Sequence, residues 1–480
     1  MQENSRKRQK YYFDILILVV VSGLVIFPAL GQERYLASRE IRHAEIIREM
    51  AERGDYLVPR LFGKIYYDKP PVIHAPAAFI TRIVGKPSMT IARMPSAIAG
   101  MLGVLATYGI GLLLLDRRSA LVGAIVLLGM PGYSLWARHA RPDMIFCAMI
   151  LFSCLCLGIG MRKYNHFPRT FYFTLAGLFA GVGVITKGPY GILVPIFFVV
   201  FAPFRNLNFT RPRLGWTGFL LGLLTAIAIW AIPAYLRDGG EYLRGVIFQP
   251  DLDVTREGSV KSFFWYVPYV LILTVPLSIF LPLAIVDLRR YGYSAPLAIA
   301  GAMFIVISCI SKKRQHYLLP LDPFLALGIA ATVVRHGITS RIVRRSARIL
   351  IIISIASIPI YFVAIQPFLQ PYKNSKIFFA KEVLGVIKPN SCIYCVSGTK
   401  EVLAWVGRDY DRICEINRND PSVTKTLCND KARYYLVSEQ DLMTLLKGKE
   451  PLSGELILNR KVGHENMMLF CLKSKTTGAP

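Results

Sequence analysis

The stretch YLASREIRHAEIIREMAERGDYLVPRLFGKIYYDKPP (residues 35–71) is the only long polar segment before the chain becomes a succession of apolar runs. It holds the densest group of ionisable residues in the first half of the chain. Of all 480 residues, 54% are hydrophobic and 18% are charged, and the mean hydropathy is +0.43. A soluble domain of this size would not stay in solution with that composition. The sequence therefore predicts a polytopic membrane protein whose chemistry starts in residues 35–71.

We explain the net charge of +27 by basic residues that orient the chain in the membrane, and not by nucleic-acid binding. Most Lys and Arg residues lie in short loops between apolar runs, where they set the topology. The first apolar run, 13–30, follows a basic head and lacks a small-residue cleavage pattern, which favours a retained anchor over a signal peptide. The nine cysteines show no zinc-finger spacing with histidine, so a structural zinc site is not expected.

Eleven apolar runs are candidates for membrane spans, which need about 20 residues each. They are 12–31, 91–115, 119–137, 143–161, 170–187, 189–204, 215–236, 263–287, 294–311, 316–334 and 346–366. The run 71–86 is shorter and is interrupted by His74, Pro76 and Arg82. If it crossed, the basic loops would face outwards. We therefore predict about eleven spans, an interfacial or re-entrant helix at 71–86, and a cytoplasmic N-terminus, as the positive-inside rule requires.

This threading predicts that five polar elements meet on the outer face. They are the loop 32–70, the turn 138–143, the turn at Lys187, the loop 237–262 and the cluster 312–316. Lys187 and the run 311–314 are exceptions to the rule that positive charge stays inside. Such an exception at a membrane face marks a candidate functional site.

The composition changes after residue 366, so we divide the chain into a transmembrane domain, 1–366, and a soluble domain, 367–480. Strands are predicted at 392–396, 433–437, 455–458 and 468–472, and helices at 376–388, 399–406 and 439–447. This is a small α/β domain, placed outside by the odd number of spans. Cys392 and Cys395 would face opposite sides of a strand, so a redox pair is not expected.

The candidate carboxylates lie at two helix starts. Glu40, Glu45, Glu49 and Glu52 recur at helical spacing between apolar residues, which indicates an amphipathic helix at the membrane surface. We expect the last three to solvate its polar face and to pair with Arg42, Arg48 and Arg53, whereas Glu40 opens the helix beside the end of the first span. Asp143 begins a span, where it is either a helix cap or part of an acid/base or cation site.

The candidate cations form two groups. Lys187 lies in ITKGP (185–189), where the glycine lets the backbone approach a ligand closely. The second group contains Lys312, Lys313, Arg314 and His316. Such residues can simply snorkel or attract anionic headgroups. Together they could hold the phosphate or pyrophosphate of a lipid in the outer leaflet, which is the interpretation we favour.

With these pieces placed, the sequence resembles the bacterial membrane glycosyltransferases of the GT-C fold, namely the 4-amino-4-deoxy-L-arabinose lipid A transferases and the related protein O-mannosyltransferases. The matching pieces are REIRHAEIIREM (39–50), GDYLVPRLFGKIYYDKPP (54–71), ARMPSA (92–97), RPD (141–143), ITKGP (185–189), FFWYVP (263–268) and KRQHYLLP (313–320). The resemblance implies transfer of a sugar from a polyprenyl-phosphate donor to a lipid A, glycan or protein acceptor, at the outer face of the bacterial cytoplasmic membrane.

Carried over to this chain, the resemblance implies Glu40 and Asp143 as catalytic carboxylates and Lys187 in the donor-phosphate site. It also implies a substrate or cation site at Tyr67, Asp68 and Lys69. The chain departs from some relatives, which have Asp-Glu where this chain has Arg39-Glu40 and an aromatic residue where it has His43. Loss of the first acid makes an arabinose-type substrate less secure.

The predicted reaction is a single displacement in which Glu40, or as second choice Asp143, takes the proton of the acceptor hydroxyl. Basic residues stabilise the departing phosphate. A transporter or lipid flippase is the alternative, although no internal repeat is visible and the unusual charge gathers at one face. A non-catalytic assembly protein would leave the outer lysines unexplained. The sugar, the acceptor and a divalent cation among the carboxylates are left open.

Overall fold

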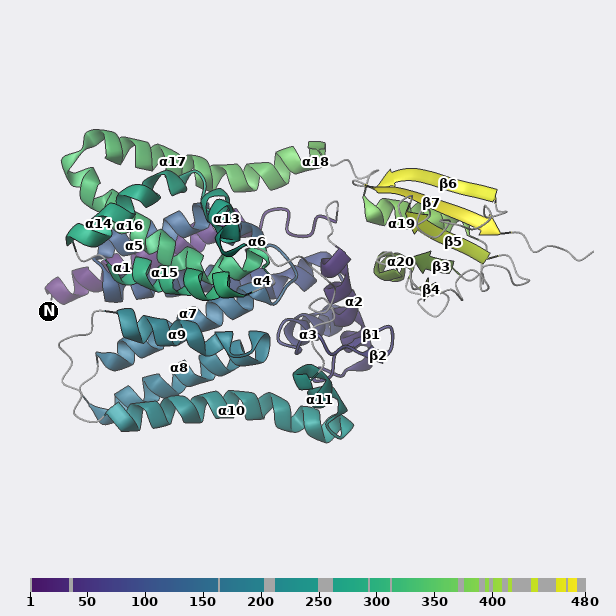
Figure 1. The fold of residues 1–480 in the computed structure, drawn as a ribbon, viewed down its shortest axis with the longest axis horizontal. Helices are drawn as coiled ribbons and strands as arrows, with labels where there is room; N and C mark the ends of the chain where they lie inside the picture. Colours follow the sequence, from purple (N-terminus) through teal and green to yellow (C-terminus); the bar gives the residue numbers. More distant parts are fainter. Residues whose placement is uncertain are drawn as a thin grey trace, which may run out of the picture.

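The structure, a computed structural model, is a bundle of helices with a small sheet domain beyond one end. It describes residues 2–33, 38–162, 165–202, 212–248, 262–291, 294–310, 313–369, 375–387, 393–396, 400–407, 413–416, 433–438, 455–462 and 465–472. Figure 1 shows the N-terminus at one end of the bundle and the sheet domain beyond the opposite end. The predicted fold class, a mainly α membrane bundle with a small C-terminal α/β domain, is confirmed.

Seven helices of the described chain are long and apolar enough to cross a membrane. They are α1 (Gln2–Ile26), α4 (Met89–Leu114), α7 (Asp143–Met161), α8 (His166–Lys187), α10 (Pro212–Asp238), η3 (Gln315–Leu321) continued by α16 (Asp322–Thr339), and α17 (Arg341–Ile360) continued by η4 (Tyr361–Ile365) and α18 (Gln366–Leu369).

Two further spans are counted if each of two bent pairs is one span. In the first pair, α5 (Arg117–Gly129) and α6 (Pro131–Ala137) are bent by 68°. The second pair joins Phe263–Leu273 to Leu277–Asp287 with a bend of 113°. Its first half consists of η1 (Phe263–Trp265) and α13 (Tyr266–Leu273), and its second half of η2 (Leu277–Phe280) and most of α14 (Leu281–Tyr291). The shorter apolar helices α9 (Tyr190–Phe201) and α15 (Ser294–Cys309) match the remaining two predicted runs. Each of the eleven runs therefore coincides with a helix or a bent helix pair among the described residues, and the count of eleven spans stays a prediction.

Two short helices cover the end of the bundle that faces the sheet domain. They are α2 (Ser38–Arg53) and α3 (His74–Val84), with the small hairpin β1 (Arg60–Leu61) and β2 (Lys64–Ile65) between them. At about 1.5 Å per residue, the 11 residues of α3 cover about half of a bilayer core. This agrees with the prediction that 71–86 does not cross. Arg82 Nη1 donates to the Ala51 carbonyl (3.0 Å) and ties α3 to α2.

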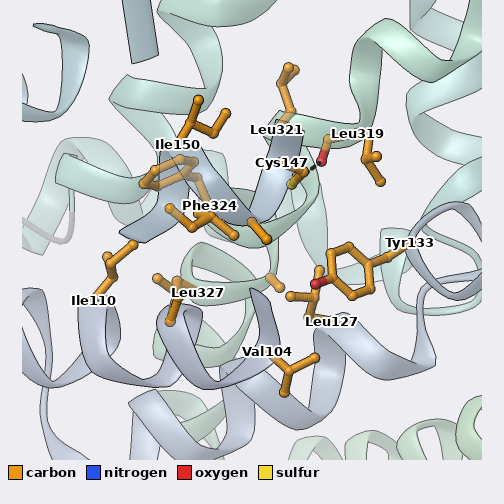
Figure 2. Close-up of a cluster of buried hydrophobic side chains, with 14 of the residues drawn as sticks. Val104, Ile110, Leu127, Tyr133, Cys147, Ile150, Leu319, Leu321, Phe324 and Leu327 are labelled. Carbon is orange, nitrogen blue, oxygen red and sulfur yellow. Dashed lines mark hydrogen bonds between the residues drawn. The ribbon is translucent and has the colours of Figure 1, made fainter. Parts of the chain in front are cut away.

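The core beneath these helices is densely packed. Figure 2 shows buried side chains from α4, α5, α6, α7, η3 and α16, among them Val104, Leu127, Cys147, Leu321 and Phe324. The Tyr133 hydroxyl donates to the Gly100 carbonyl at 2.7 Å and joins α6 to α4. This packing gives a firm support to the start of α7 and to η3, which both carry predicted site residues.

Helices α8 and α10 approach each other through glycines. A Cβ added to Gly177 would lie 1.9 Å from the Phe219 carbonyl oxygen, and one added to Gly222 would lie 2.1 Å from the Thr174 carbonyl oxygen. Small residues allow such close contact between membrane helices. Gly188 then ends α8 with φ +68°, a conformation that favours glycine. The chain is thereby turned immediately after Lys187.

The C-terminal domain is a five-stranded mixed sheet in the order β4-β3-β5-β7-β6, with helices α19 (Lys376–Val386) and α20 (Lys400–Gly407). Its strands are β3 (Ile393–Val396), β4 (Ile413–Ile416), β5 (Arg433–Ser438), β6 (Glu455–Val462) and β7 (Glu465–Leu472). Strand β3 pairs in parallel with β4 and β5, and β7 pairs antiparallel with β5 and β6. The sequence missed β4. Cys392 and the predicted helix 439–447 lie outside the described residues.

Helix α2 is covered on several sides. It packs against α20 of the C-terminal domain, and one buried cluster contains Ile47 of α2 and Leu403 of α20. Two of its glutamates, Glu45 and Glu49, are fully buried, so the prediction that they solvate a polar face is wrong. Glu45 pairs with Arg48, and Glu49 accepts from the backbone N–H of Gly63 at 3.1 Å. The helix is buried because the β1–β2 hairpin, α3 and the C-terminal domain all pack against it.

Candidate functional site

A cavity of about 770 Å³ lies at the end of the bundle that carries α2 and α3. It is bounded by the segment 67–70, the start of α7, the end of α8, and η3. Seven predicted site residues line it: Tyr67, Asp68, Lys69, Asp143, Lys187, Arg314 and His316. Residues from 67 to 316 therefore meet around one space, as expected from the threading.

Asp143 is the charged centre of this cavity. It is the first residue of α7 and only 3% exposed, and its carboxylate forms an ion pair with Lys187 Nζ at the end of α8. Arg141 Nε lies 3.6 Å from Asp143 Oδ2, and His316 Nε2 lies 3.7 Å from Oδ1. An acid at a helix N-terminus and a lysine at a helix C-terminus are both stabilised by the helix dipoles. The two helix ends therefore fix this pair.

The polar wall of the cavity carries a surplus of positive charge. Four cationic side chains (Lys69, Arg141, Lys187 and Arg314) face two carboxylates (Asp68 and Asp143). Lys187 Nζ also lies 5.4 Å from the ring centroid of Phe146 and 5.5 Å from that of Tyr317, within the range of cation–π attraction. The wall is therefore complementary to an anion.

Apolar side chains line the rest of the cavity. They include Ile227, Trp230 and Ala231 of α10, Leu243, Val246 and Ile247 of α11 (Glu241–Phe248), Ile307 of α15 and Ile310 just after it. The Tyr67 hydroxyl donates to Glu241 Oε1 at 2.8 Å and holds α11 beside the polar segment 67–70. One cavity thus offers both charged and hydrocarbon surface.

Glu40, the first-choice catalytic base of the sequence analysis, is not among the residues that line the cavity. It is 1% exposed, and its Oε1 accepts from Arg93 Nε (2.7 Å) and Ala140 N (2.9 Å) while its Oε2 accepts from Arg93 Nη2 (3.1 Å). Burial alone would raise the pKa of Glu40, but Arg93 and the other donors lower it. A buried carboxylate with three donors is a weak proton acceptor, and the catalytic role of Glu40 stays a prediction.

The second cationic group is divided by the structure. Arg314 and His316 line the cavity, whereas Lys313 is buried and its Nζ donates to the Ile310 carbonyl at 2.6 Å. Lys312 lies outside the described residues. Among the described residues, no group of three or more His, Cys, Asp or Glu is placed to hold a metal ion.

Two lining residues, His43 and Arg141, received no role in the sequence analysis. Arg141 directly precedes the Pro142-Asp143 pair, and its guanidinium also lies 5.0 Å from the Trp136 ring. The RPD motif (141–143) contained the signal for Arg141, since its first residue, like its third, carries a charge. No local signal marks His43, because its partner His74 is 31 residues away.

The helix bundle is that of a polytopic membrane protein, and comparisons with known proteins identify its fold as the GT-C fold. A family model described as "Dolichyl-phosphate-mannose-protein mannosyltransferase" matches residues 68–231. Similar curated proteins include the undecaprenyl phosphate-alpha-4-amino-4-deoxy-L-arabinose arabinosyl transferases of Shewanella sediminis (24% identical, covering 68% of this chain and 61% of the relative) and Pectobacterium carotovorum (27%, covering 66% and 58%). The chain spans about three fifths of the length of these two relatives.

Two solved structures share the fold. ArnT of Cupriavidus metallidurans in the apo state matches with a TM-score of 0.74 at 17% identity, over 97% of this chain and 99% of that chain. The Archaeoglobus fulgidus oligosaccharyltransferase matches with a TM-score of 0.54 at 12% identity, over 92% and 71%. The resemblance to the arabinose and mannose transferases is confirmed, and the chain is a multi-span membrane protein related to them.

Proposed function

We propose that the protein transfers a sugar from a polyprenyl-phosphate donor to an acceptor at the outer face of the bacterial cytoplasmic membrane. The observation that carries the proposal is a single cavity lined both by a surplus of cationic side chains and by many apolar ones. A polyprenyl phosphate has the matching halves, an anionic phosphate and a hydrocarbon chain. The ArnT of Cupriavidus metallidurans has also been solved bound to undecaprenyl phosphate, and its fold matches this chain with a TM-score of 0.71 at 17% identity.

The cations assigned to the phosphate are Lys187, Arg141, Arg314 and Lys69. Arginine presents several N–H groups to phosphate oxygens, whereas lysine acts as a point charge. Asp143 holds Lys187 at the polar wall through their ion pair. The phosphate then lies among cations that are already in place, which lowers the cost of organising them during the reaction.

The reaction is a single displacement. An acceptor hydroxyl oxygen bonds to the anomeric carbon of the sugar, and the bond from that carbon to the phosphate oxygen breaks. The electron pair leaves with the polyprenyl phosphate, whose developing negative charge is stabilised by Lys187 and the arginines. A phosphate leaving group needs no general acid, so the site requires only a proton acceptor for the hydroxyl.

We assign the cavity and the C-terminal domain to the outer side, with the N-terminus in the cytoplasm. Figure 1 places the N-terminus at the end of the bundle opposite α2, α3 and the sheet domain. The basic pair Arg117-Arg118 lies at the N-terminal end, where Arg117 contacts Asp14 of α1 at 2.6 Å. Positive charge at that end supports a cytoplasmic orientation.

The test compares cell-envelope glycolipids and glycoproteins by mass spectrometry in cells with and without this protein. We expect a glycan modification that disappears with the gene. Purified protein should bind undecaprenyl phosphate and should bind undecaprenol, the matched lipid without phosphate, at least about tenfold more weakly, because charge-assisted hydrogen bonds are lost. An unchanged glycan profile together with altered uptake of small solutes would refute the proposal and favour a transporter.

A further inference from the structure

Two histidines connect the cavity to the protein interior. His43 of α2 lines the cavity, and its Nδ1 lies 2.8 Å from Nε2 of His74, the first residue of α3. His43 is 6% exposed and His74 is 0% exposed, and their ring centroids are 5.0 Å apart. A contact of 2.8 Å between two ring nitrogens requires a proton on one of them and a lone pair on the other.

The surroundings keep both rings neutral. Burial lowers the pKa of His43 well below its usual value, and His74, Arg141 and Arg42 lower it further while Asp143 raises it. Burial also lowers the pKa of His74, to about 3. At neutral pH each ring therefore carries one proton, and the direction of the hydrogen bond depends on which nitrogen of His74 holds it.

His74 Nε2 faces His43, and its other ring nitrogen, Nδ1, is buried without a hydrogen-bond partner. A proton on His74 Nδ1 leaves its Nε2 as an acceptor. His43 then donates through Nδ1 and keeps an unprotonated Nε2, which is its remaining polar atom for a ligand in the cavity.

We propose that His43 is the proton acceptor of the sugar transfer and that His74 is the positioning residue that fixes its tautomer, an inference that rests on the proposed function. As the acceptor oxygen bonds to the anomeric carbon, its proton passes to His43 Nε2. The carbon–oxygen bond to the phosphate breaks and its electron pair leaves with the polyprenyl phosphate. The imidazolium formed donates to His74 through Nδ1 and then releases its proton to water.

The two carboxylates predicted from the sequence are engaged elsewhere. Glu40 is held by Arg93 and Ala140 outside the cavity lining, and Asp143 is held by Lys187. His43 combines a place in the cavity lining with a buried histidine behind it. A base held by a second buried group is the arrangement by which enzymes orient a catalytic imidazole.

Donor binding adjusts the strength of this base. The charged and titratable groups that face His43 are His74 on α3, Arg42 on its own helix, Arg141 before α7 and Asp143 on α7. A phosphate bound beside Arg141 adds negative charge and offsets the two arginines. The pKa of His43 therefore rises when the donor arrives, which brings it closer to the pH of the reaction and increases its efficiency as a base.

The experiment uses full-length protein in membranes that supply the host's own donor and acceptor, with the initial rate of sugar incorporation read by mass spectrometry. His43→Gln keeps a hydrogen-bonding side chain but cannot take the proton. We expect its rate to fall by about 10² to 10⁴-fold, while the purified variant binds undecaprenyl phosphate within about threefold of wild type. A variant rate within about threefold of wild type, with binding intact, overturns the inference.

The matched pair His74→Gln and His74→Phe tests the positioning role and does not depend on whether His43→Gln folds. The Gln oxygen can still accept from His43 Nδ1, so its rate should stay within about threefold of wild type, whereas Phe should lose about tenfold or more. The wild-type rate should fall at acid pH as His43 protonates, and His74→Phe should move this acid limb. Equal rates and the same limb in both variants overturn the inference. A wild type without any transfer refutes the proposed function itself.

Discussion

The ion pairs Glu40–Arg93 and Asp143–Lys187 lie at the same end of the bundle, and each joins a nearly buried carboxylate to a cation far away in the sequence. Glu40 is closed in by α4 and by the backbone of residue 140. Asp143 and Lys187 face a cavity of about 770 Å³ with further cations around it. The comparison shows that burial and ion pairing alone do not distinguish a structural ion pair from one in a functional site. Access to a cavity separates the two.

The largest effect is expected when the pair that faces the cavity is broken. Lys187→Ala removes a cation from the phosphate wall and leaves Asp143 without its closest partner. The transfer rate should fall by about 10³-fold or more, and binding of undecaprenyl phosphate should weaken by about tenfold. Both quantities are measured in the assays described above.

Arg118→Ala is the control for this variant, because Arg118 is an exposed basic residue outside the cavity lining, next to the Arg117 that pairs with Asp14 of α1. It should bind and transfer like wild type. If Lys187→Ala bound undecaprenyl phosphate as tightly as wild type, the assignment of the cationic wall to the phosphate would be wrong.

Breaking the closed pair should affect stability and spare the chemistry. Glu40→Gln preserves the shape of the side chain but leaves the Arg93 guanidinium buried without its counter-charge. We expect a loss of about 3 kcal/mol in the free energy of unfolding, because an uncompensated buried charge is costly. Thermal unfolding in detergent measures this loss, and the transfer rate per folded molecule should stay within about threefold.

The matched control is Glu52→Gln on the same helix, since the side chain of Glu52 is 57% exposed. A surface pair of this kind contributes at most about 1 kcal/mol. A Glu40→Gln variant that is as stable as wild type but inactive would contradict this prediction and would indicate that Glu40 is the base.

The two pairs also show which parts of the molecule the sequence could predict. Apolar runs such as 143–161 coincide with helices because hydrophobicity along a single segment is a local property. The convergence of Asp143 and Lys187 followed from counting spans, since two successive crossings, α7 and α8, return the chain to the same face. The Glu40–Arg93 and His43–His74 contacts join residues 53 and 31 positions apart and carry no local pattern. The burial of Glu49 could not be predicted for the same reason, since the hairpin and the C-terminal domain that pack on α2 are distant in the sequence.

The histidine pair beside the open cavity should make stability depend on pH. His74 has a folded-state pKa of about 3, below the value of about 6.5 for an unfolded chain. The unfolded state therefore binds more protons between these values, and stability falls as pH falls below 6.5. Going from pH 7 to pH 5 should cost about 2 kcal/mol for His74 alone, seen as a lower thermal midpoint in detergent.

His74→Phe removes this contribution, so its thermal midpoint should change less between pH 7 and pH 5. Tyr66→Phe is the control, because Tyr66 packs edge-on against His74 (ring centroids 6.3 Å apart) and the substitution leaves both histidines in place. Its pH dependence should equal that of wild type. Identical pH dependence in wild type and His74→Phe would show that His74 is not held neutral by burial.

The smallest effect concerns the apolar side chains of the cavity. Ile247 of α11 lines the cavity and is 68% exposed, so Ile247→Asn should fold normally. A polar side chain there removes part of the surface offered to the lipid chain, and the affinity for undecaprenyl phosphate should fall by about fivefold. The neighbouring Phe248→Asn, also exposed but outside the cavity lining, should leave binding unchanged. Equal affinities in the two variants would mean that the hydrocarbon chain does not contact these apolar residues. Only the cations around Asp143 and Lys187 would then distinguish this pair from Glu40–Arg93.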